Sequence, residues 1–286
     1  MTTTLDGKLC FVTGANSGIG LVTARELARQ GADVLLGCRR PEQGRAASEE
    51  IARVTGRAPT VLVADFASLA EVRDLASRVA ALGRPIDVLV NNAGLMLTER
   101  RTTADGFEMT FGVNHLATFL LTRLLLDRIA PDGRIVTVAS RAHKRSTLDF
   151  DDLQSERGYD GWRTYCRSKL CNVLFNLELA RRLGPGGITA NSLHPGVIAT
   201  GFGRETTGFW RIGFRIIRPF QKTAEQGAAT SIYLASSPEV RGMTGRYFAD
   251  CRPVEPSRAG SDPAAAKRLW EITEGLLGLD PLPIRA

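Results

Sequence analysis

A short apolar run followed at once by a glycine-rich turn and a helix constrains the fold of this chain most. Residues 8–13 (Lys-Leu-Cys-Phe-Val-Thr) are typical of a buried strand, and residues 14–20 are Gly-Ala-Asn-Ser-Gly-Ile-Gly. A helical stretch follows over residues 21–30, and Gly31 closes it. Glycines let the backbone approach a bound group closely, and a helix N-terminus offers free N–H groups and a positive dipole end. The segment therefore predicts a phosphate-binding loop.

Strands and helices alternate along most of the chain. We expect further strands over residues 33–37, 60–64, 86–90, 134–139 and 188–193, and helices over residues 41–55, 69–82, 106–129 and 162–183. This alternation predicts an α/β fold, a doubly wound parallel sheet of the Rossmann type with about seven strands and helices on both faces. No linker rich in Pro, Gly or Ser divides the 286 residues, so we expect a single domain over residues 1–286.

Residues with functional side chains or flexible backbone fall where the predicted strands end. Ligands of open α/β sheets bind beyond the carboxyl ends of the strands. The residues at those ends are Gly14, Asp65, Asn91, Ser140 and Pro195. Their coincidence at one edge of the sheet predicts the location of the site.

Tyr165 and Lys169 stand four residues apart on a predicted helix, so they lie on one face of it. A tyrosine has a pKa of about 10, and a neighbouring cation lowers it because the cation favours the phenolate. The pair would then supply a proton donor or acceptor near neutral pH. The same spacing arises by chance on many helices, and a half-buried tyrosine beside a solvated lysine is the alternative.

The composition limits the kinds of molecule that we expect this protein to bind. The formal net charge is +7, but the arginines are scattered, which argues against nucleic acid. No run of roughly 20 apolar residues indicates a membrane span, and residues 1–8 do not resemble a signal peptide. Five cysteines without paired spacing indicate reduced thiols and a cytoplasmic protein. The three histidines and the cysteines do not cluster at ligand spacing, so we expect no metal site.

These motifs together resemble the short-chain dehydrogenase/reductase family. The matching segments are residues 13–20, residues 91–94, Asn114, Ser140, Tyr165 with Lys169, and Pro195-Gly196, all in the family's order. Within the family the chain is most similar to the retinol dehydrogenase branch, through residues 37–39, 112–116, 165–170, 178–183, 194–196, 248–251 and 268–270. The chain departs from that branch in lacking an N-terminal hydrophobic anchor and in having Ala139 before Ser140, where relatives have two serines.

The resemblance implies an active site. Tyr165 would be the general acid in carbonyl reduction and the general base in alcohol oxidation. Lys169 would lower its pKa and hold the nicotinamide ribose, Ser140 would hydrogen-bond the substrate oxygen, and Asn114 would support a water relay behind Lys169 or simply kink its helix. The implied cofactor contacts are Gly14, Asn16, Ser17, Gly18, Ile19, Gly20, Arg39, Asp65, Phe66, Asn92, Ala93, Gly94, Tyr165, Lys169, Pro195, Gly196, Val197 and Thr200.

The end of the second strand bears on the choice of cofactor. A fold of this kind that selects NAD places an acid there, whereas an arginine suits the 2′-phosphate of NADP. Residues 37–40 are Gly-Cys-Arg-Arg, with no acid. We therefore expect NADP(H), with Arg39 as the phosphate ligand and Arg40 as a second candidate. Asp65 would lie near the adenine, and its alternative role is an N-cap of the next helix.

Residues 201–222 interleave large apolar side chains with arginine and lysine. Three interpretations stay open: a lid packed on its own domain, a cap over an apolar substrate, and a basic amphipathic segment in weak contact with a membrane surface. Residues 260–286 form a C-terminal extension, and the charged residues 143–161 are expected to border the site. We expect His143 on the surface, and His115 and His194 packed inside.

We therefore expect an enzyme that uses NADPH to reduce the carbonyl of an apolar small molecule, reversibly as an alcohol dehydrogenase. The alternative from another class is a dinucleotide-binding sensor or scaffold without turnover. The complete set of Ser140, Tyr165 and Lys169 favours the enzyme. The resemblance also implies a homodimer or homotetramer through the helices that contain Phe107 and Tyr165.

Overall fold

In the computed structural model, which describes residues 5–185, 187–196 and 223–284, eight strands form one sheet in the order β3-β2-β1-β4-β5-β6-β7-β8. The strands are β1 (Leu9–Thr13), β2 (Asp33–Cys38), β3 (Thr60–Val63), β4 (Ile86–Asn91), β5 (Ile129–Val138), β6 (Thr189–His194), β7 (Tyr247–Ala249) and β8 (Arg252–Pro253). The first seven pair in parallel, which confirms the predicted doubly wound sheet. The eighth is a two-residue strand antiparallel to β7, which the sequence analysis did not anticipate.

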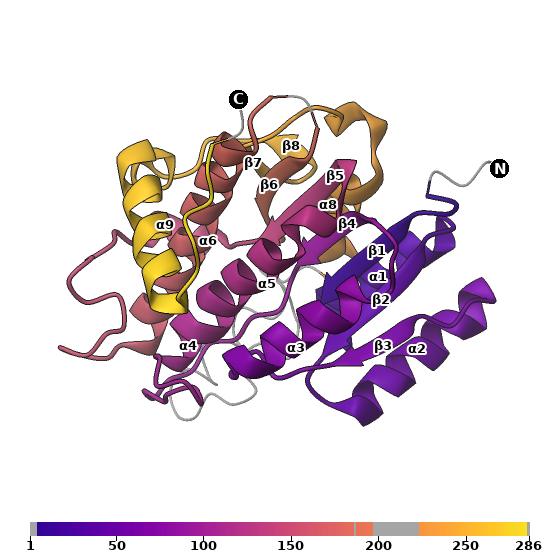
Figure 1. Cartoon of the computed structure of the whole chain (residues 1–286), viewed down its shortest axis with the longest axis horizontal. Helices are drawn as coiled ribbons and strands as arrows, with labels where there is room; N and C mark the ends of the chain where they lie inside the picture. The colour runs from indigo at the N-terminus through magenta and orange to yellow at the C-terminus, as the bar shows by residue number, and fades with distance from the viewer. Residues whose placement is uncertain (1–4, 186, 197–222, 285–286) are drawn as a thin grey trace.

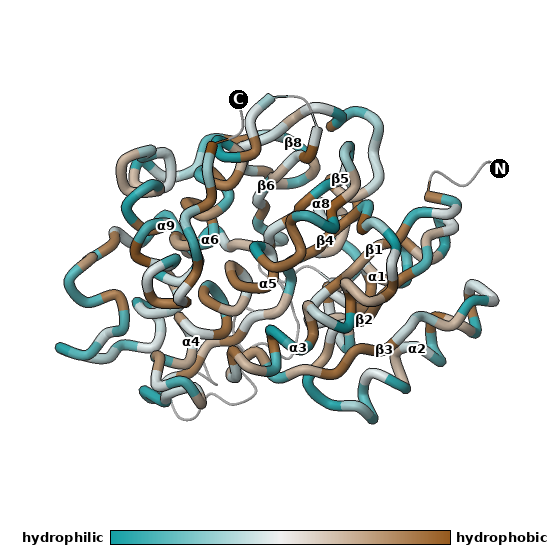
Figure 2. Tube along the Cα trace, in the orientation of Figure 1, coloured by the Kyte–Doolittle hydropathy of each residue, from teal (hydrophilic) through white to brown (hydrophobic). Residues whose placement is uncertain are grey.

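Helices cover both faces of the sheet (Figure 1). The longer ones are α1 (Gly18–Arg29), α2 (Pro41–Thr55), α3 (Leu69–Ala80), α5 (Ala117–Leu125), α6 (Gly161–Leu183), α8 (Ala224–Ser236) and α9 (Pro263–Leu277). Because successive side chains of a strand point to opposite faces, Cys10 and Val12 pack with α1, α2 and α8, whereas Leu9 and Phe11 pack with α3, α5 and α6. Figure 2 shows the hydrophobic segments concentrated in the central strands and α5.

The predicted helix over residues 106–129 is not continuous. It consists of α4 (Met109–Phe111), a π-helical turn η1 (Gly112–Leu116), α5 and a final 3₁₀ turn η2 (Leu126–Arg128). It begins only at Met109 because the Glu108 carboxylate accepts hydrogen bonds from the N–H groups of Thr110 and Phe111. Strand β5 then starts at Ile129, five residues earlier than predicted, since Ile129 pairs with Ile86 before the register shifts.

The same helical stretch, Met109–Arg128, is the one segment among the described residues that could cross a membrane by length and composition. The sequence analysis expected no apolar run of this length. In the structure 83% of its most apolar window is buried inside the protein. The stretch is accordingly a core helix.

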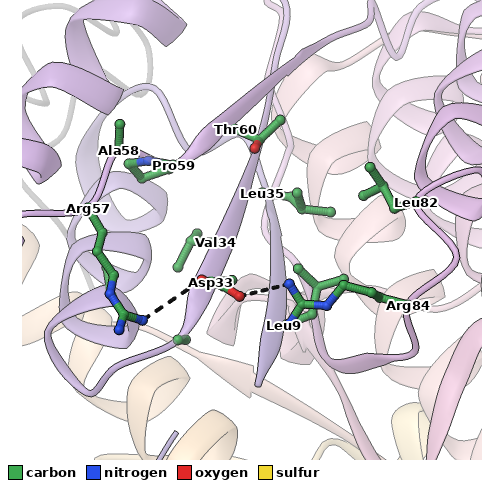
Figure 3. A pocket seen from close by; sticks show the side chains of 12 residues that line it. Leu9, Asp33, Val34, Leu35, Arg57, Ala58, Pro59, Thr60, Leu82 and Arg84 are labelled. Carbon is green, nitrogen blue, oxygen red and sulfur yellow. Dashed lines mark hydrogen bonds and ion pairs between the residues drawn. The ribbon is translucent and has the colours of Figure 1, made fainter. Parts of the chain in front are cut away.

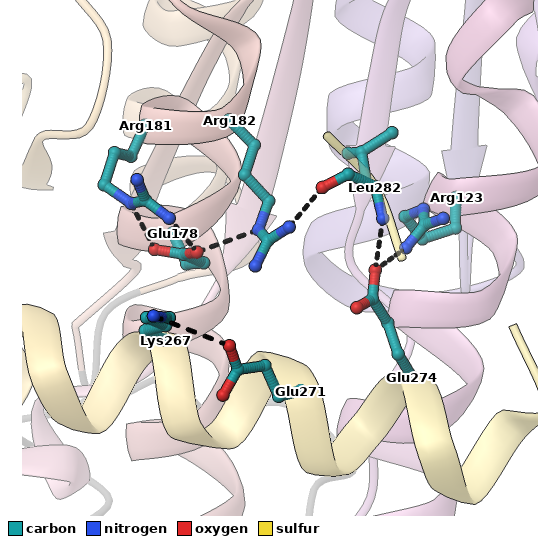
Figure 4. A network of polar contacts seen from close by, with 8 residues as sticks. All are labelled: Arg123, Glu178, Arg181, Arg182, Lys267, Glu271, Glu274 and Leu282. Carbon is teal, nitrogen blue, oxygen red and sulfur yellow. Dashed lines mark hydrogen bonds and ion pairs between the residues drawn. The ribbon is translucent and has the colours of Figure 1, made fainter. Parts of the chain in front are cut away.

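Helix α9 packs against α6 and α5 (Figure 1). Its Trp270 stacks on Phe175 of α6 with ring centroids 5.8 Å apart and lies 4.6 Å from the Phe119 ring of α5. Ion pairs flank this contact (Figure 4): Arg123 with Glu274, and Arg182 with Glu178 at 2.8 Å. The C-terminal extension therefore covers part of the two helices through which the resemblance implied a homo-oligomer, and that oligomer stays a prediction.

Candidate active site

The glycine loop lies directly on the segment that follows β4. Gly14 and Gly18 have positive φ angles of 64° and 56°, which favour glycine. A Cβ atom at Gly14 would lie 2.9 Å from Ala93 Cα, and one at Gly20 would lie 2.3 Å from Gly14 O. These close approaches leave no room for side chains, so the backbone of the loop and residues 92–94 form one surface.

Two polar side chains join the loop to this segment. Thr13 Oγ1 accepts hydrogen bonds from the N–H groups of Asn92 and Ala93, both at 3.0 Å. Asn92 Nδ2 donates to Thr13 O at 2.8 Å and to Gly14 O at 3.1 Å. Thr13 was not among the predicted site residues, although its position before the first glycine was a signal. Both amide protons of Asn92 are used within the protein, so its side chain holds the loop in place.

The N-terminus of α1 suits an anionic group. Its N-cap, Ser17, makes no side-chain capping hydrogen bond, and the first turn contains no acidic residue. The free N–H groups and the positive end of the helix dipole therefore fit a pyrophosphate. Asn16 next to it donates to Gln43 of α2 at 2.8 Å. Ile19 follows in the first turn of α1.

Ser140 and Tyr165 meet at the carboxyl end of β5. Ser140 is half-buried and is the N-cap of a 3₁₀ turn, η3 (Arg141–Arg145), its Oγ accepting from Ala142 N at 3.1 Å. Its side chain also hydrogen-bonds Tyr165, which is 8% exposed. The tyrosine is held on α6, whose N-cap is Asp160. A reacting oxygen would thus find two hydroxyl groups together.

Lys169 lies one turn further along α6. Its ammonium donates to Val138 O at 3.0 Å and lies 5.8 Å from the Tyr165 ring centroid. The side chain is 3% exposed. A Cβ atom at Gly94 would lie 3.3 Å from this ammonium, so the segment after β4 passes directly beside it. The structure thus brings Lys169, Tyr165, Ser140 and Gly94 together.

Burial shifts the pKa values of Tyr165 and Lys169. It raises the pKa of Tyr165 to about 12, and the hydrogen bond with Ser140 opposes this rise. It lowers the pKa of Lys169 to about 8. The expected depression of the Tyr165 pKa by Lys169 is therefore not seen in the protein alone: the ammonium is directed to Val138 O, and desolvation of the phenol dominates. In the protein alone, burial thus opposes the charged form of both groups.

Asn114 is fully buried in the π-helical turn η1. Its Nδ2 donates to Leu95 O at 2.9 Å and to Ser168 Oγ at 3.0 Å, and its Oδ1 accepts from Leu95 N at 2.7 Å. Turns of this kind are frequent at functional sites. Asn114 therefore lies where the helix is distorted, and its side chain holds the chain after Gly94 against α6.

The predicted ligands of the adenosine half lie around the end of β2 and β3. Arg39 and Arg40 are exposed, and no hydrogen bond or ion pair of the Arg39 side chain occurs within the described parts of the chain. Asp65 Oδ1 accepts from Ala67 N at 2.9 Å, whereas Ser68 is the N-cap of α3, so Asp65 is not that cap. Phe66 is buried in the core.

The final predicted ligands follow β6. Pro195 and Gly196 lie at its carboxyl end, where Gly196 N donates to His194 Nδ1 at 2.9 Å and has a φ of 92°. Val197, Thr200 and the proposed lid over residues 201–222 lie outside the described residues.

The expectation that His143 lies on the surface is wrong. The residue is fully buried, with Nδ1 2.6 Å from Ser140 O and Nε2 accepting from Ser257 N at 3.1 Å. Ser257 is 114 residues away, so no local pattern could have indicated the contact. His115 is packed as expected, with Nε2 3.0 Å from Thr273 Oγ1, and Cys166 and Cys171 are buried.

Two other kinds of candidate site were considered among the described residues: a metal site and a second hollow. Among the described residues, no group of three or more His, Cys, Asp or Glu side chains is placed to hold a metal. A hollow of about 310 Å³ is lined by residues that include Leu9, Asp33 and Thr60, at the amino ends of β1, β2 and β3 (Figure 3). Asp33 pairs there with Arg84 at 2.8 Å and Arg57 at 3.9 Å. The hollow is thus at the opposite edge of the sheet from Tyr165.

Known proteins resemble this chain over nearly its whole length. A family model described as short chain dehydrogenase matches residues 8–208. Retinol dehydrogenase 14 from Homo sapiens is 42% identical over 294 residues, covering 96% of this chain and 88% of the relative. Retinol dehydrogenase 11 from Homo sapiens is 42% identical over 282 residues, covering 97% and 88%.

Solved structures also resemble this chain over most of its length. An uncharacterised protein from Mycobacterium paratuberculosis has a TM-score of 0.80 at 35% identity, over 98% of this chain and 96% of that one. A short chain dehydrogenase from Burkholderia cenocepacia, solved in complex with NADP, has a TM-score of 0.69 at 30% identity, over 86% and 96%.

Proposed function

The chain belongs to the short-chain dehydrogenase family, oxidoreductases of alcohol and carbonyl groups that bind a nicotinamide dinucleotide, and we propose that it uses NADPH to reduce the carbonyl of an apolar small molecule. The reverse reaction oxidises the alcohol. The observation that supports this proposal best is the gathering of Ser140, Tyr165 and Lys169 at one place, with the Lys169 ammonium 5.8 Å from the Tyr165 ring centroid and the glycine loop at the same edge of the sheet.

Each residue has a definite task in this proposal. A bound NADPH supplies the hydride that reaches the carbonyl carbon. Tyr165 gives its phenolic proton to the carbonyl oxygen as negative charge develops there. Ser140 donates a hydrogen bond to the same oxygen. Gly14, Gly18 and the N-terminus of α1 would hold the pyrophosphate, and Lys169 would hold the nicotinamide ribose.

The protonation state of the site favours reduction. With a pKa of about 12, Tyr165 carries its proton at pH 7, as a general acid must. Oxidation needs the phenolate, which is scarce at that pH. We therefore propose reduction as the faster direction at neutral pH, with oxidation gaining as the pH rises.

The choice of NADPH rests on the end of β2. Arg39 is exposed there, and β2 ends in Gly37 and Cys38 with no carboxylate to take a ribose 2′-hydroxyl. A guanidinium offers a fork of donors that suits a 2′-phosphate. Three structural relatives were solved with NADP or NADPH bound.

We propose retinoids or other large apolar carbonyls as the substrate class. The sequence relatives bear the name retinol dehydrogenase. Residues 201–222 contain large apolar side chains, among them Phe202, Phe209, Trp210, Phe214 and Phe220, which suit such a substrate if this segment caps the site. Turnover confined to small polar ketones would contradict this assignment.

The direct test is NADPH oxidation by the purified protein against retinals, steroids, quinones, aliphatic aldehydes and polar ketones. Tyr165→Phe keeps the ring and removes the proton, so we expect it to bind NADPH normally and to lose nearly all turnover. Tyr159→Phe, at a tyrosine whose hydroxyl donates to Leu97 O and Glu108 Oε1 instead, is the matched control. Normal turnover by Tyr165→Phe would exclude the mechanism.

The cofactor is tested at Arg39. Arg39→Ala should weaken NADPH binding while leaving NADH binding within about twofold, because one charge-assisted contact to phosphate is worth roughly 1.5–3 kcal/mol. The same substitution at Arg40 tests the second candidate, and we expect it to change the ratio of the two affinities less than Arg39→Ala does. An unchanged ratio of the two affinities in Arg39→Ala would mean that another residue selects the cofactor.

We also propose a cytoplasmic location, with which five free cysteines are consistent. Cell fractionation tests the location. Co-sedimentation with anionic liposomes tests the proposed surface contact of residues 201–222, and salt-insensitive or absent binding would remove that contact from the proposal.

A further inference from the structure

His143 occupies both hydrogen-bonding positions of the Ser140 carbonyl. Its backbone N–H donates to Ser140 O at 3.1 Å, and its ring Nδ1 lies 2.6 Å from the same oxygen. A carbonyl oxygen has two lone pairs, so one residue uses both. The ring contact is shorter than the roughly 2.9–3.0 Å usual for an N–H···O bond. His143 thereby determines how the peptide group of Ser140 is turned.

The other ring nitrogen is held by the C-terminal arm, which we define as residues 254–261. Ser257 N–H donates to His143 Nε2 at 3.1 Å. The adjacent Lys144 donates through Nζ to Glu255 O at 2.9 Å. Two consecutive residues of η3 therefore bind the arm, so the turn that begins at Ser140 and the arm are one unit.

These partners assign the tautomer of the ring. Because Ser140 O accepts, Nδ1 carries the proton, and because Ser257 N–H donates, Nε2 keeps its lone pair. The ring is fully buried and meets Tyr247 edge to face with centroids 4.8 Å apart. Rotation of the ring would break both hydrogen bonds and this contact.

The ring is not needed to form the turn itself. The N–H groups of Ala142 and His143 already close η3 onto the Oγ and the carbonyl of Ser140, at 3.1 Å each. The His143 ring adds a second donor to the Ser140 carbonyl, and the C-terminal arm holds the ring in place. Its effect should therefore appear in the placement of Ser140 more than in folding.

We infer that His143 is a positioning residue: its ring, held by Ser257 of the C-terminal arm, sets the peptide plane of Ser140 and hence the direction of the Ser140 hydroxyl at the reacting oxygen. This inference rests on the proposed function, since it uses the hydroxyl of Ser140 in the reaction. The C-terminal arm therefore takes part in the site, although it lies more than 110 residues after His143 in the chain.

Two substitutions separate the two ring contacts. His143→Asn keeps an amide donor near the position of Nδ1 and loses the acceptor for Ser257. His143→Gln keeps an acceptor near Nε2 and loses the donor to Ser140. We expect His143→Asn, whose donor the C-terminal arm no longer holds, to lower kcat by about threefold. We expect His143→Gln, which loses the donor to Ser140 itself, to lower kcat by roughly tenfold or more, because small misplacements at a reacting centre are costly. The KM for NADPH should stay unchanged in both.

Wild-type kcat in His143→Gln, or equal losses in both variants, would overturn the inference. If His143→Gln does not fold, His143→Ala takes its place, because it also removes the donor. Ser140→Ala is measured in the same assay: wild-type turnover there would refute the proposed function instead.

A readout independent of turnover completes the test. The ¹⁵N spectrum of histidine-labelled protein distinguishes the ring tautomers, and substitution of each of the three histidines assigns the signals. An Nδ1–H tautomer for His143 agrees with the inference. An Nε2–H tautomer overturns it whether or not a substrate is known.

Discussion

Replacing Gly20 with alanine tests whether the glycine loop is set by contact with the segment after β4. The new Cβ would lie 2.3 Å from Gly14 O and 2.4 Å from Asn92 Nδ2, whereas ordinary contact begins at 3.4 Å. The neighbours must therefore retreat by about 1.1 Å (3.4 − 2.3). Neither is free to do so, because Asn92 Nδ2 donates to Gly14 O at 3.1 Å and to Thr13 O at 2.8 Å.

Overpacking of this kind costs about 1–3 kcal/mol. If the glycine loop moves to relieve the overlap, its N–H groups no longer face the pyrophosphate. The NADPH affinity should then fall by roughly ten- to a hundredfold, since about 1.4 kcal/mol corresponds to a factor of ten. The assay is a fluorescence titration with NADPH, accompanied by thermal unfolding. Gly158→Ala is the matched control, since no atom lies within 4 Å of its Cβ position. Wild-type NADPH affinity in Gly20→Ala would refute the reasoning.

Three further predictions concern stability, measured by urea unfolding. Trp270→Ala should lower the free energy of unfolding by about 3–5 kcal/mol, because a buried ring stacked on Phe175 is lost, and Trp270→Phe by less than half as much; equal losses would contradict this. Gly275→Ala, on an exposed position of α9 with open space around it, should raise it by about 0.5–1 kcal/mol, and a loss would mean that the helix end is strained. Burial lowers the pKa of His115 to about 3 in the folded protein. As the pH falls below about 6.5, His115 binds a proton in the unfolded chain but not in the folded one. The folded state therefore loses stability between pH 6.5 and pH 3. In His115→Phe the loss between pH 6.5 and 5 should be smaller by about 2 kcal/mol, and identical pH slopes would exclude the assignment.

The alternation of elements and the place of the site were predictable because they depend on local pattern. Apolar runs such as residues 9–13 and 86–91 form strands whose alternate side chains are buried on both faces. Parallel strands end at one edge, so Gly14, Ser140 and Asn91 had to gather there. The same logic placed Tyr165 one helical turn from Lys169.

Predictions failed where a distant partner decides the outcome. His143 looked like a surface residue because its neighbours in sequence are Lys144 and Arg145, yet Ser257 and Tyr247 enclose it. A lysine four residues from a tyrosine suggested a lowered phenol pKa, but the depth of burial on α6 and a carbonyl that binds the ammonium determine the protonation states.

The fold class and the groups that meet at the ends of the strands follow from the amino-acid order, because hydrophobic period, glycine turns and helical spacing are properties of neighbouring residues. How tightly those groups are held depends on contacts between distant segments. Thr13 and Asn92 fasten the glycine loop, His143 turns the peptide group of Ser140, and Trp270 holds α9 against α6. Each of these contacts joins segments far apart in the chain, and their distances and burial exist only once the sheet and its helices have assembled.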